Sequence, residues 1–246
     1  MQTGINLFTL RDIDEPLPRV LERVADAGYD GVEFLHRLPE ADVDAVIETL
    51  DETELEVPSS HLGPFVELEQ LPSELDATID TYVAVGCEAL AVSIGEEKLD
   101  SRASIRETAS RLDALSARAA EHDIDFLYHN HHWEFRPLDG STAFDYLLDA
   151  TDDIGIELDV GWVAAAGDDP VERIHRHGDQ LEILHVKDAN IATKESVEVG
   201  EGDVDLFSCI DAAREEGVEW FIYEHDEPTD ALDSLERGSA FLDQFR

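Results

Sequence analysis

Eight ionisable side chains in this sequence share one kind of position, at or directly after the end of a short apolar run. They are Glu33, His61, His129, His131, Asp159, His185, Lys187 and Glu224. Carboxylates and imidazoles transfer protons near neutral pH and bind divalent cations. Any one of them could be a partly exposed loop residue, but many uncompensated charges would be costly to bury unless something binds there. The pattern therefore predicts a site for acid–base or metal chemistry.

Four of these residues form the set that is most specific for a metal: His129, Asp159, His185 and Glu224, each after a different apolar run. Two imidazoles and two carboxylates can surround one divalent cation and leave positions open for substrate oxygens. The alternative is a group of hydrogen-bonding side chains without a metal. We expect one divalent metal ion, which could be manganese, zinc, magnesium or cobalt.

Side chains two residues apart in a strand point to the same face. Lys187 therefore shares a face with His185, and Glu157 shares one with Asp159. Glu157 could be the partner of a metal ligand or a buried proton-transfer group, and the sequence leaves both roles open.

The densest polar segment is Tyr-His-Asn-His-His-Trp-Glu at residues 128–134. Alternation predicts that His129 and His131 point one way and His132 the other, which makes His132 a loop residue outside the site. Glu134 lies beyond the strand and could reach the metal, brace His131 or do neither.

Short apolar runs alternate with longer amphipathic stretches about eight times along the chain. The predicted strands are Gly4–Phe8, Gly31–Leu35, Val57–Leu62, Ala89–Ser93, Ile124–Asn130, Ile154–Val160, Leu181–Lys187 and Trp220–His225. The clearest predicted helices are Glu15–Ala27, Ser101–His122, Val204–Glu216 and Thr229–Phe245.

This alternation predicts an α/β fold, a single (β/α)8 barrel. Such a barrel has about 250 residues, and its functional loops all leave from the carboxyl ends of buried parallel strands. A doubly wound open sheet is the competing fold. It would be favoured by a glycine-rich phosphate turn after the first strand, which residues 6–11 do not contain. No Pro-, Gly- or Ser-rich linker divides the chain, so we expect one domain over residues 1–246.

The charge of the chain limits its partners. With 17 basic and 59 acidic residues the net charge is −42, which disfavours nucleic acid because most of the surface would repel a polyanion. No apolar run approaches the roughly 18 to 20 residues that span a membrane. We therefore expect a cytoplasmic protein that binds neither nucleic acid nor membrane. Excess acid with only three lysines also suggests a halophile, since at molar salt the screening length is only about 3 Å.

The motifs, taken in order, resemble the sugar phosphate isomerase/epimerase family, also called the xylose isomerase-like TIM-barrel family, in a haloarchaeal form. Nearly the whole chain takes part in the resemblance. The motifs are GINLFTLRD, GYDGVEF, YHNHHWEF, ELDVGWVAAAGDDP, HVKD, VGEGDVD and YEHDEP, most of them at the ends of separate predicted strands.

The resemblance implies a divalent metal held by side chains from the last four strands. Asp159, His185 and Glu224 match three of the family's ligand positions. His129 stands where many relatives have a glutamate that serves as proton acceptor in the two-glutamate epimerases, and Trp162 stands where they have histidine. These two differences put simple sugar epimerisation in doubt.

The implied activity is isomerisation or epimerisation of a small sugar or keto-polyol. A proton next to a metal-chelated carbonyl is removed, and an enediolate forms. If a β-substituent leaves instead, the same site acts as a dehydratase or lyase on an inosose or a 3-keto sugar.

The resemblance also suggests roles for individual side chains. Glu224 is the expected metal ligand with possible base function, and His129 or His131 would relay a proton. Lys187 could neutralise the enediolate, orient a substrate oxygen, or form an ion pair with Asp188 or Asp159. The expected substrate contacts are Glu33, His61, Trp133 and Trp162.

Two other function classes deserve comparison. An apurinic endonuclease of the same superfamily would need more metal ligands and a cationic face for DNA, which the charge of −42 contradicts. A barrel that binds carbohydrate without turnover stays open because of His129 and Trp162. The expected partner is a small carbohydrate, whether or not the chain forms a homo-oligomer.

Overall fold

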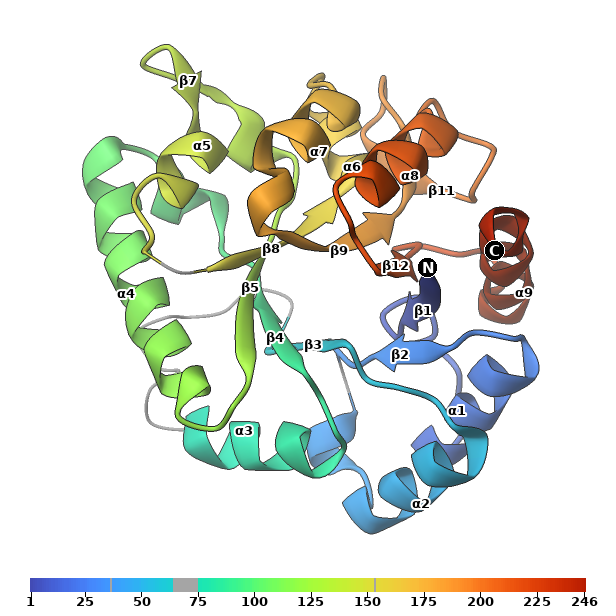
Figure 1. Cartoon of the computed structure of the whole chain (residues 1–246). Helices are drawn as coiled ribbons and strands as arrows, with labels where there is room; N and C mark the ends of the chain where they lie inside the picture. The colour runs from blue at the N-terminus through green and yellow to red at the C-terminus, as the bar shows by residue number, and fades with distance from the viewer. Residues whose placement is uncertain (36, 64–74, 153) are drawn as a thin grey trace.

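Eight parallel strands form the centre of the protein, in the order β2-β1-β12-β9-β8-β5-β4-β3. The computed structural model describes residues 1–35, 37–63, 75–152 and 154–246. Isolated parallel bridges between Gly31 and Glu56 and between Phe34 and Ser60 join β2 to β3, so the two ends of the sheet meet. Figure 1 shows the strands around a central axis with the helices outside them. The predicted (β/α)8 barrel is confirmed.

Seven of the barrel strands lie within the predicted ranges and are shorter at their ends, whereas β1 begins and ends two residues before the predicted Gly4–Phe8. They are β1 (Gln2–Asn6), β2 (Gly31–Glu33), β3 (Ser59–His61), β4 (Ala89–Val92), β5 (Asp125–His129), β8 (Gly155–Asp159), β9 (Leu181–Val186) and β12 (Trp220–Tyr223). Two antiparallel hairpins are additional: β6 (Pro137–Leu138) with β7 (Ser141–Thr142), and β10 (Asp188–Asn190) with β11 (Glu195–Val197). Strands of two or three residues are too short to show a periodic pattern.

The helices surround the barrel. They are α1 (Leu17–Asp26), α2 (Val43–Thr53), α3 (Leu75–Ala84), α4 (Arg102–Ala120), α5 (Ala143–Leu148), α6 (Val160–Ala165), α7 (Pro170–His177), α8 (Leu206–Glu215) and α9 (Ala231–Leu242). The predicted helices correspond to α1, α4, α8 and α9. Within the described residues, no helix combines the length and the apolar character that crossing a membrane requires.

Acidic residues begin several of these helices. The carboxylates of Asp42, Asp169, Asp205 and Asp230 accept hydrogen bonds from backbone N–H groups of the first turn of α2, α7, α8 and α9. A negative charge at this end also interacts favourably with the helix dipole. Part of the acidic surplus therefore has a local structural role.

An apolar plug fills the amino-terminal part of the barrel interior. Its members are Ala89, Ala91, Leu127, Ile183, Trp220 and Ile222. Glycine makes room for the largest of them: a Cβ at Gly31 would lie 2.7 Å from the Trp220 ring, and one at Gly4 would lie 2.6 Å from Ile222. On β5, β9 and β12 a polar residue follows two positions after a plug residue, so alternation stacks it above the plug. These polar residues are His129, His185 and Glu224.

Close packing of α9 on β12 gives a test of the fold. A Cβ at Gly238 would lie 2.2 Å from the Tyr223 ring. Alanine normally stabilises a helix relative to glycine by about 1 kcal/mol, but overpacking here should cost about 1–3 kcal/mol. We therefore expect Gly238→Ala to lower the unfolding midpoint in urea. Exposed Ala240 in the same helix is the matched control. Ala240→Gly should destabilise the protein by propensity alone, and a stabilised Gly238→Ala variant would contradict the packing.

Candidate functional site

The four residues predicted to bind a metal come together at the carboxyl ends of β5, β8, β9 and β12. His129, Asp159, His185 and Glu224 each offer one ligand atom, and these atoms all lie within 4.8 Å of one another. Their side chains are buried, with Glu224 the most exposed at 5%. We call these four residues the outer set.

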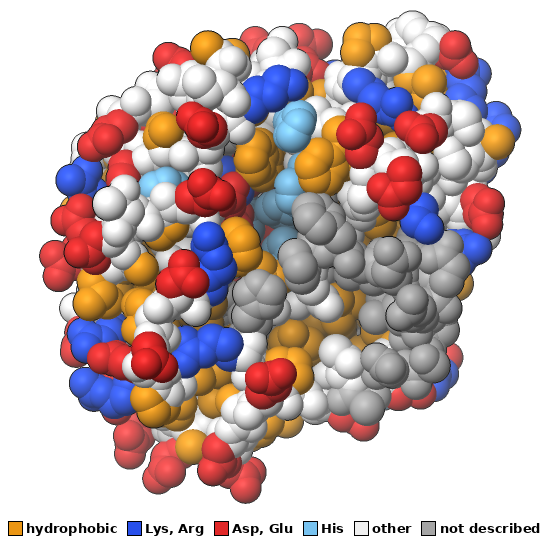
Figure 2. Space-filling view, turned by 180° about the vertical axis from the view of Figure 1, so that it is seen from behind, with side chains coloured by type: hydrophobic (Ala, Val, Ile, Leu, Met, Phe, Trp, Pro, Cys, Tyr) orange, Lys and Arg blue, Asp and Glu red, His pale blue; other side chains and the backbone are white. Residues whose placement is uncertain are grey.

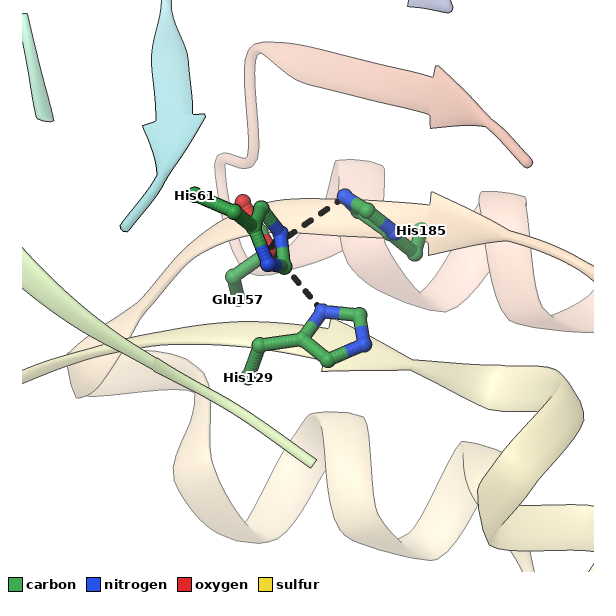
Figure 3. Close-up of side chains that lie close together, drawn as sticks. All are labelled: His61, His129, Glu157 and His185. Carbon is green, nitrogen blue, oxygen red and sulfur yellow. Dashed lines mark hydrogen bonds and ion pairs between the residues drawn. The ribbon is translucent and has the colours of Figure 1, made fainter. Parts of the chain in front are cut away.

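A second group of buried side chains lies deeper along the barrel axis. Its centre is Glu157, and its other members are Glu33, His61, His129 and His185. We call these five residues the inner cluster. Figure 3 shows three imidazole rings around the Glu157 carboxylate. The inner cluster and the outer set share His129 and His185.

Local structure aims Asp159 into the site. Asp159 ends β8 and caps α6, and its Oδ1 atom accepts a hydrogen bond from the backbone N–H of Trp162 at 2.9 Å. The Asn130 side chain bonds both the N–H and the carbonyl of Asp159, which ties β5 to β8. Its Oδ2 atom is buried and accepts no hydrogen bond from any described residue. One oxygen is therefore fixed by the helix, and the other faces the Lys187 ammonium at 3.0 Å.

Lys187 supplies the positive charge beside the outer set. Its Nζ atom lies 3.0 Å from Asp159 Oδ2, 3.1 Å from Glu224 Oε2 and 2.8 Å from Asp226 Oδ1. The side chain is buried, and Gly161 leaves space for it, since a Cβ there would lie 2.8 Å from Lys187 Cγ. Asp226 is outside the outer set, so Lys187 keeps one carboxylate partner whatever Asp159 and Glu224 bind.

Neighbouring charges shift the pKa of one residue in the inner cluster, His61, upward and that of one residue in the outer set, Glu224, downward. Burial alone would lower the pKa of His61, but the carboxylates of Glu157 and Glu33 raise it to about 10. Burial opposes ionisation of Glu224, yet the Lys187 ammonium and the bond to His185 outweigh it and hold the pKa of Glu224 well below its usual value. Glu224 is therefore a carboxylate at neutral pH, and His61 is an imidazolium.

The outer set fits a divalent cation by its donor chemistry. It combines two imidazoles with two carboxylates in a buried place, a mixture that zinc, manganese and cobalt accept. Asp159 Oδ2 is a buried acceptor without a hydrogen bond among the described residues, although Lys187 Nζ is close to it. Lys187 is shared by three carboxylates, so a divalent ion would supply the charge that Asp159 and Glu224 lack. The residues that would hold the ion are His129, Asp159, His185 and Glu224.

A cavity of about 320 Å³ opens above these groups. Figure 2 shows histidine side chains in the hollow of this face. Most of the predicted site residues line it: His61, His129, His131, Trp133, Trp162, Lys187 and Glu224. Glu33 does not contact the space, because it is fully buried in the inner cluster and is held by Asn6 and Ser59. Glu33 was predicted to contact substrate. In the structure its carboxylate faces His61 and His185 and not the cavity.

Aromatic rings hold His131 at the cavity wall. Its ring stacks on Trp133 with centroids 4.4 Å apart and lies 5.8 Å from the ring of Trp162. Burial, with His129 and Lys187 nearby, places the pKa of His131 well below its usual value. The imidazole is therefore neutral at neutral pH. His132 packs against the edge of Trp133 and lies off the cavity wall, as alternation predicts.

Glu134 braces the backbone beside the site. Its carboxyl accepts hydrogen bonds from Tyr128 Oη at 2.8 Å and from the backbone N–H of His131 at 3.0 Å. It belongs to neither metal-compatible group among the described residues. Of the three roles that the sequence left open, the geometry favours the bracing of His131.

Several residues of the cavity were not predicted from the sequence. They are Phe8, Arg11, Leu35, Ser93, Asp226 and Glu227. Asp226 could have been found, because it follows Glu224 by two residues just as Lys187 follows His185. Phe8 and Arg11 lie in the turn after β1, where Arg11 stacks over the Phe8 ring, and no periodic pattern marks such a turn.

Comparison with known proteins agrees with this architecture. The model of the xylose isomerase-like TIM barrel family matches residues 21–245. The chain belongs to this family. An inosose dehydratase from Geobacillus kaustophilus (strain HTA426) is 28% identical over 192 residues, which are 69% of this chain and 61% of that protein. The chain thus matches about three fifths of the length of this relative.

Solved structures of similar proteins share the barrel. A sugar phosphate isomerase/epimerase from Parabacteroides distasonis ATCC 8503 superimposes with a TM-score of 0.84 at 18% identity and covers 99% of this chain and 98% of its own. The IOLI protein with a bound zinc atom has a TM-score of 0.78 at 18% identity, covering 99% and 97%. At such identities the likeness concerns the fold alone.

Glu134 should make the free energy of unfolding of this xylose isomerase-like barrel depend on pH. Burial raises the pKa of Glu134 to about 8, against the bonds from Tyr128 and His131 that favour its ionised form. A carboxyl that keeps its proton in the folded state contributes stability below its unfolded pKa, and this is lost as the pH rises through about 8. We expect the stability of the native protein relative to Glu134→Gln to fall between pH 5 and 9. Urea unfolding of both proteins measures this difference, and a constant difference would contradict the assignment.

Proposed function

We propose that this barrel is a divalent-metal-dependent isomerase or epimerase of a small sugar or keto-polyol, which removes a proton next to a carbonyl. The observation that carries the proposal is the outer set, two imidazoles and two carboxylates whose ligand atoms lie within 4.8 Å of one another. His129 and Glu224 also line a cavity walled by aromatic rings. A divalent ion held there would polarise the carbonyl and stabilise negative charge on its oxygen.

The side chains of the cavity wall supply the proton chemistry. Glu224 is a carboxylate that can accept a proton, and the neutral ring of His131 can accept or return one. Of the two predicted relay histidines, His131 suits this role better, because both ring nitrogens of His129 face carboxylates. Lys187 stays an ammonium and stabilises negative charge that develops beside it.

Two aromatic rings support a carbohydrate ligand. Trp133 and Trp162 line the cavity together with His131. The flat faces of tryptophan pack well against the C–H surfaces of a sugar ring. Polar groups at the cavity floor would then meet the hydroxyl and carbonyl oxygens. This arrangement supports a small carbohydrate as the partner.

A dehydratase that acts on an inosose or a 3-keto sugar is the second candidate. Two observations favour it: the related protein is named an inosose dehydratase, and His129 stands where the two-glutamate epimerases have a carboxylate. Loss of a β-hydroxyl needs a proton donor for the departing oxygen. His131 and Lys187 are the cavity groups that could donate.

The experiments should be run at molar salt. With a net charge of −42, self-repulsion favours expansion of the chain at low ionic strength. We propose that the protein works in a halophilic cytoplasm, and its stability should then rise between about 0.1 and 3 M potassium chloride. Thermal unfolding across this series tests the habitat without affecting the assignment of the site.

Metal retention tests the outer set. We expect Asp159→Ala and His185→Ala to lose tightly bound divalent metal, since each removes a donor from a site of four. Elemental analysis after dialysis measures the content. Exposed Asp179→Ala and His175→Ala are matched controls that should keep wild-type content. Full metal content in both site variants would refute the ligand assignment.

Solvent exchange tests the proton chemistry. Deuterium from the solvent should enter one carbon of a substrate found among ketoses, inososes and 3-keto sugars, and mass spectrometry measures it. Glu224→Gln should keep the fold and lower turnover by about 10²- to 10⁴-fold, the usual contribution of a general base. Full activity of this variant would exclude Glu224 as the base. A native protein that binds carbohydrate but exchanges no deuterium would be a binding barrel.

A further inference from the structure

His129 and His185 each point one ring nitrogen to the inner cluster and the other to the outer set. The inward atom of His129 is Nδ1, 2.9 Å from Glu157 Oε1, and its outward Nε2 is 3.9 Å from Asp159 Oδ2. In His185 the two nitrogens exchange places, with Nε2 pointing inward and Nδ1 outward. Its inward Nε2 lies 3.1 Å from Glu33 Oε1 and 3.3 Å from Glu157 Oε1, and its outward Nδ1 lies 3.0 Å from Glu224 Oε2.

A histidine that binds a cation is neutral and carries one ring proton. One of its nitrogens can then donate a hydrogen bond, and only the other can offer a lone pair to the ion. Carboxylates accept hydrogen bonds, as both oxygens of Glu33 do from Asn6 and Ser59. An inward nitrogen beside them therefore keeps the proton, which leaves the lone pair on the outward nitrogen. With a cation in the outer set, the opposite orientation of the two rings would place the proton on Nδ1 in His129 and on Nε2 in His185.

We propose that Glu157 and Glu33 are positioning residues that select these two tautomers and so present both histidines to a cation in the outer set. This inference rests on the proposed function. Glu157 serves His129, for which it is the inward carboxylate, whereas Glu33 is the nearer acceptor for His185. The assignment resolves the role of Glu157 that the sequence leaves open: it is a partner of the ligands and not a group on the cavity wall.

Contacts with neighbouring side chains hold the carboxylates of Glu33 and Glu157 in place. Asn6 and Ser59 donate hydrogen bonds to the two oxygens of Glu33, and His61 Nε2 lies between the two acids, 2.7 Å from Glu157 Oε1 and 3.2 Å from Glu33 Oε1. All these side chains are at most 5% exposed. Glu33 is thus held through both oxygens, and Glu157 through Oε1, which faces His61, His129 and His185. Loss of a carboxylate that orients a metal-binding histidine typically weakens metal binding 10- to 100-fold.

Charge balance argues against the inner cluster as the place of the ion itself, although His61, His129, Glu157 and His185 are also close enough to hold one. An ion there would leave Asp159, Glu224 and Asp226 with Lys187 as their neighbouring cation. An ion in the outer set instead offsets Asp159 and Glu224, while Lys187 pairs with Asp226, and Glu157 and Glu33 keep their contacts with His61 Nε2. The second arrangement leaves no group of three buried carboxylates to share a single ammonium.

Nuclear magnetic resonance of the zinc-loaded protein tests the inference directly. Long-range proton–nitrogen correlations of ¹⁵N-labelled histidines distinguish a protonated ring nitrogen from one that binds zinc. We expect His129 to be protonated on Nδ1 with zinc on Nε2, and His185 to be protonated on Nε2 with zinc on Nδ1. The reversed pattern would place the ion in the inner cluster and overturn the proposal. A native protein that binds no zinc would instead contradict the proposed function.

Substitutions of Glu157 and Glu33 distinguish the effect of each carboxylate on its histidine. Glu157→Leu should shift the Nδ1 resonance of His129 and weaken zinc binding about 10- to 100-fold in a chelator competition. It should shift the Nε2 resonance of His185 less, because Glu33 still faces that atom at 3.1 Å. Glu33→Leu should do the reverse. The isosteric Glu157→Gln and Glu33→Gln keep an acceptor oxygen and should restore most of the affinity.

The control is Glu198→Gln, which changes a carboxylate bonded to His225 outside both groups. It should leave zinc affinity and both ring patterns unchanged. Equal shifts of both rings in every variant, or wild-type affinity in both leucine variants, would overturn the positioning role. If a leucine variant fails to fold, the glutamine variants and the native ring pattern still decide the matter.

Discussion

Compensation of buried charge is the constraint on which the site depends. Four carboxylates, three imidazoles and one ammonium lie toward the carboxyl ends of the barrel strands, and each residue is at most 5% exposed. They are Glu33, Glu157, Asp159, Glu224, His61, His129, His185 and Lys187. Isolated charges would be very costly there. Each carboxylate lies within 3.3 Å of a cationic or imidazole nitrogen. The arrangement is stable only as a network, and a cation in the outer set would extend it.

Backbone geometry produces this network with few specialised elements. Alternation along parallel strands stacks an apolar plug, the inner cluster and the outer set along one axis. On β5, β9 and β12 a packing residue of the plug is followed two positions later by a polar one. His129 and His185 connect the two polar layers because an imidazole has two opposed nitrogens. The same spacing places Lys187 above His185, where it meets Asp159 and Glu224. The inner cluster thereby supports the groups that face the cavity.

The strands, the barrel and the convergence of His129, Asp159, His185 and Glu224 could be predicted from the sequence, because strand alternation is periodic and parallel strands end at one rim. The short hairpins, the turn that carries Arg11 and the burial of Glu33 could not, because they depend on contacts between distant segments. The role of Glu157 needed the register of β8 against β5 and β9. Sequence alone also does not distinguish isomerisation from loss of a hydroxyl, since both begin with removal of a proton.

The most direct measurement is anomalous scattering from crystals grown at high salt with zinc, with data collected on both sides of the zinc absorption edge. The account predicts one strong anomalous peak in contact with Asp159 Oδ2, Glu224 and His185 Nδ1. A peak among His61, Glu157 and Glu33, or no peak near these residues at saturating zinc, would contradict it.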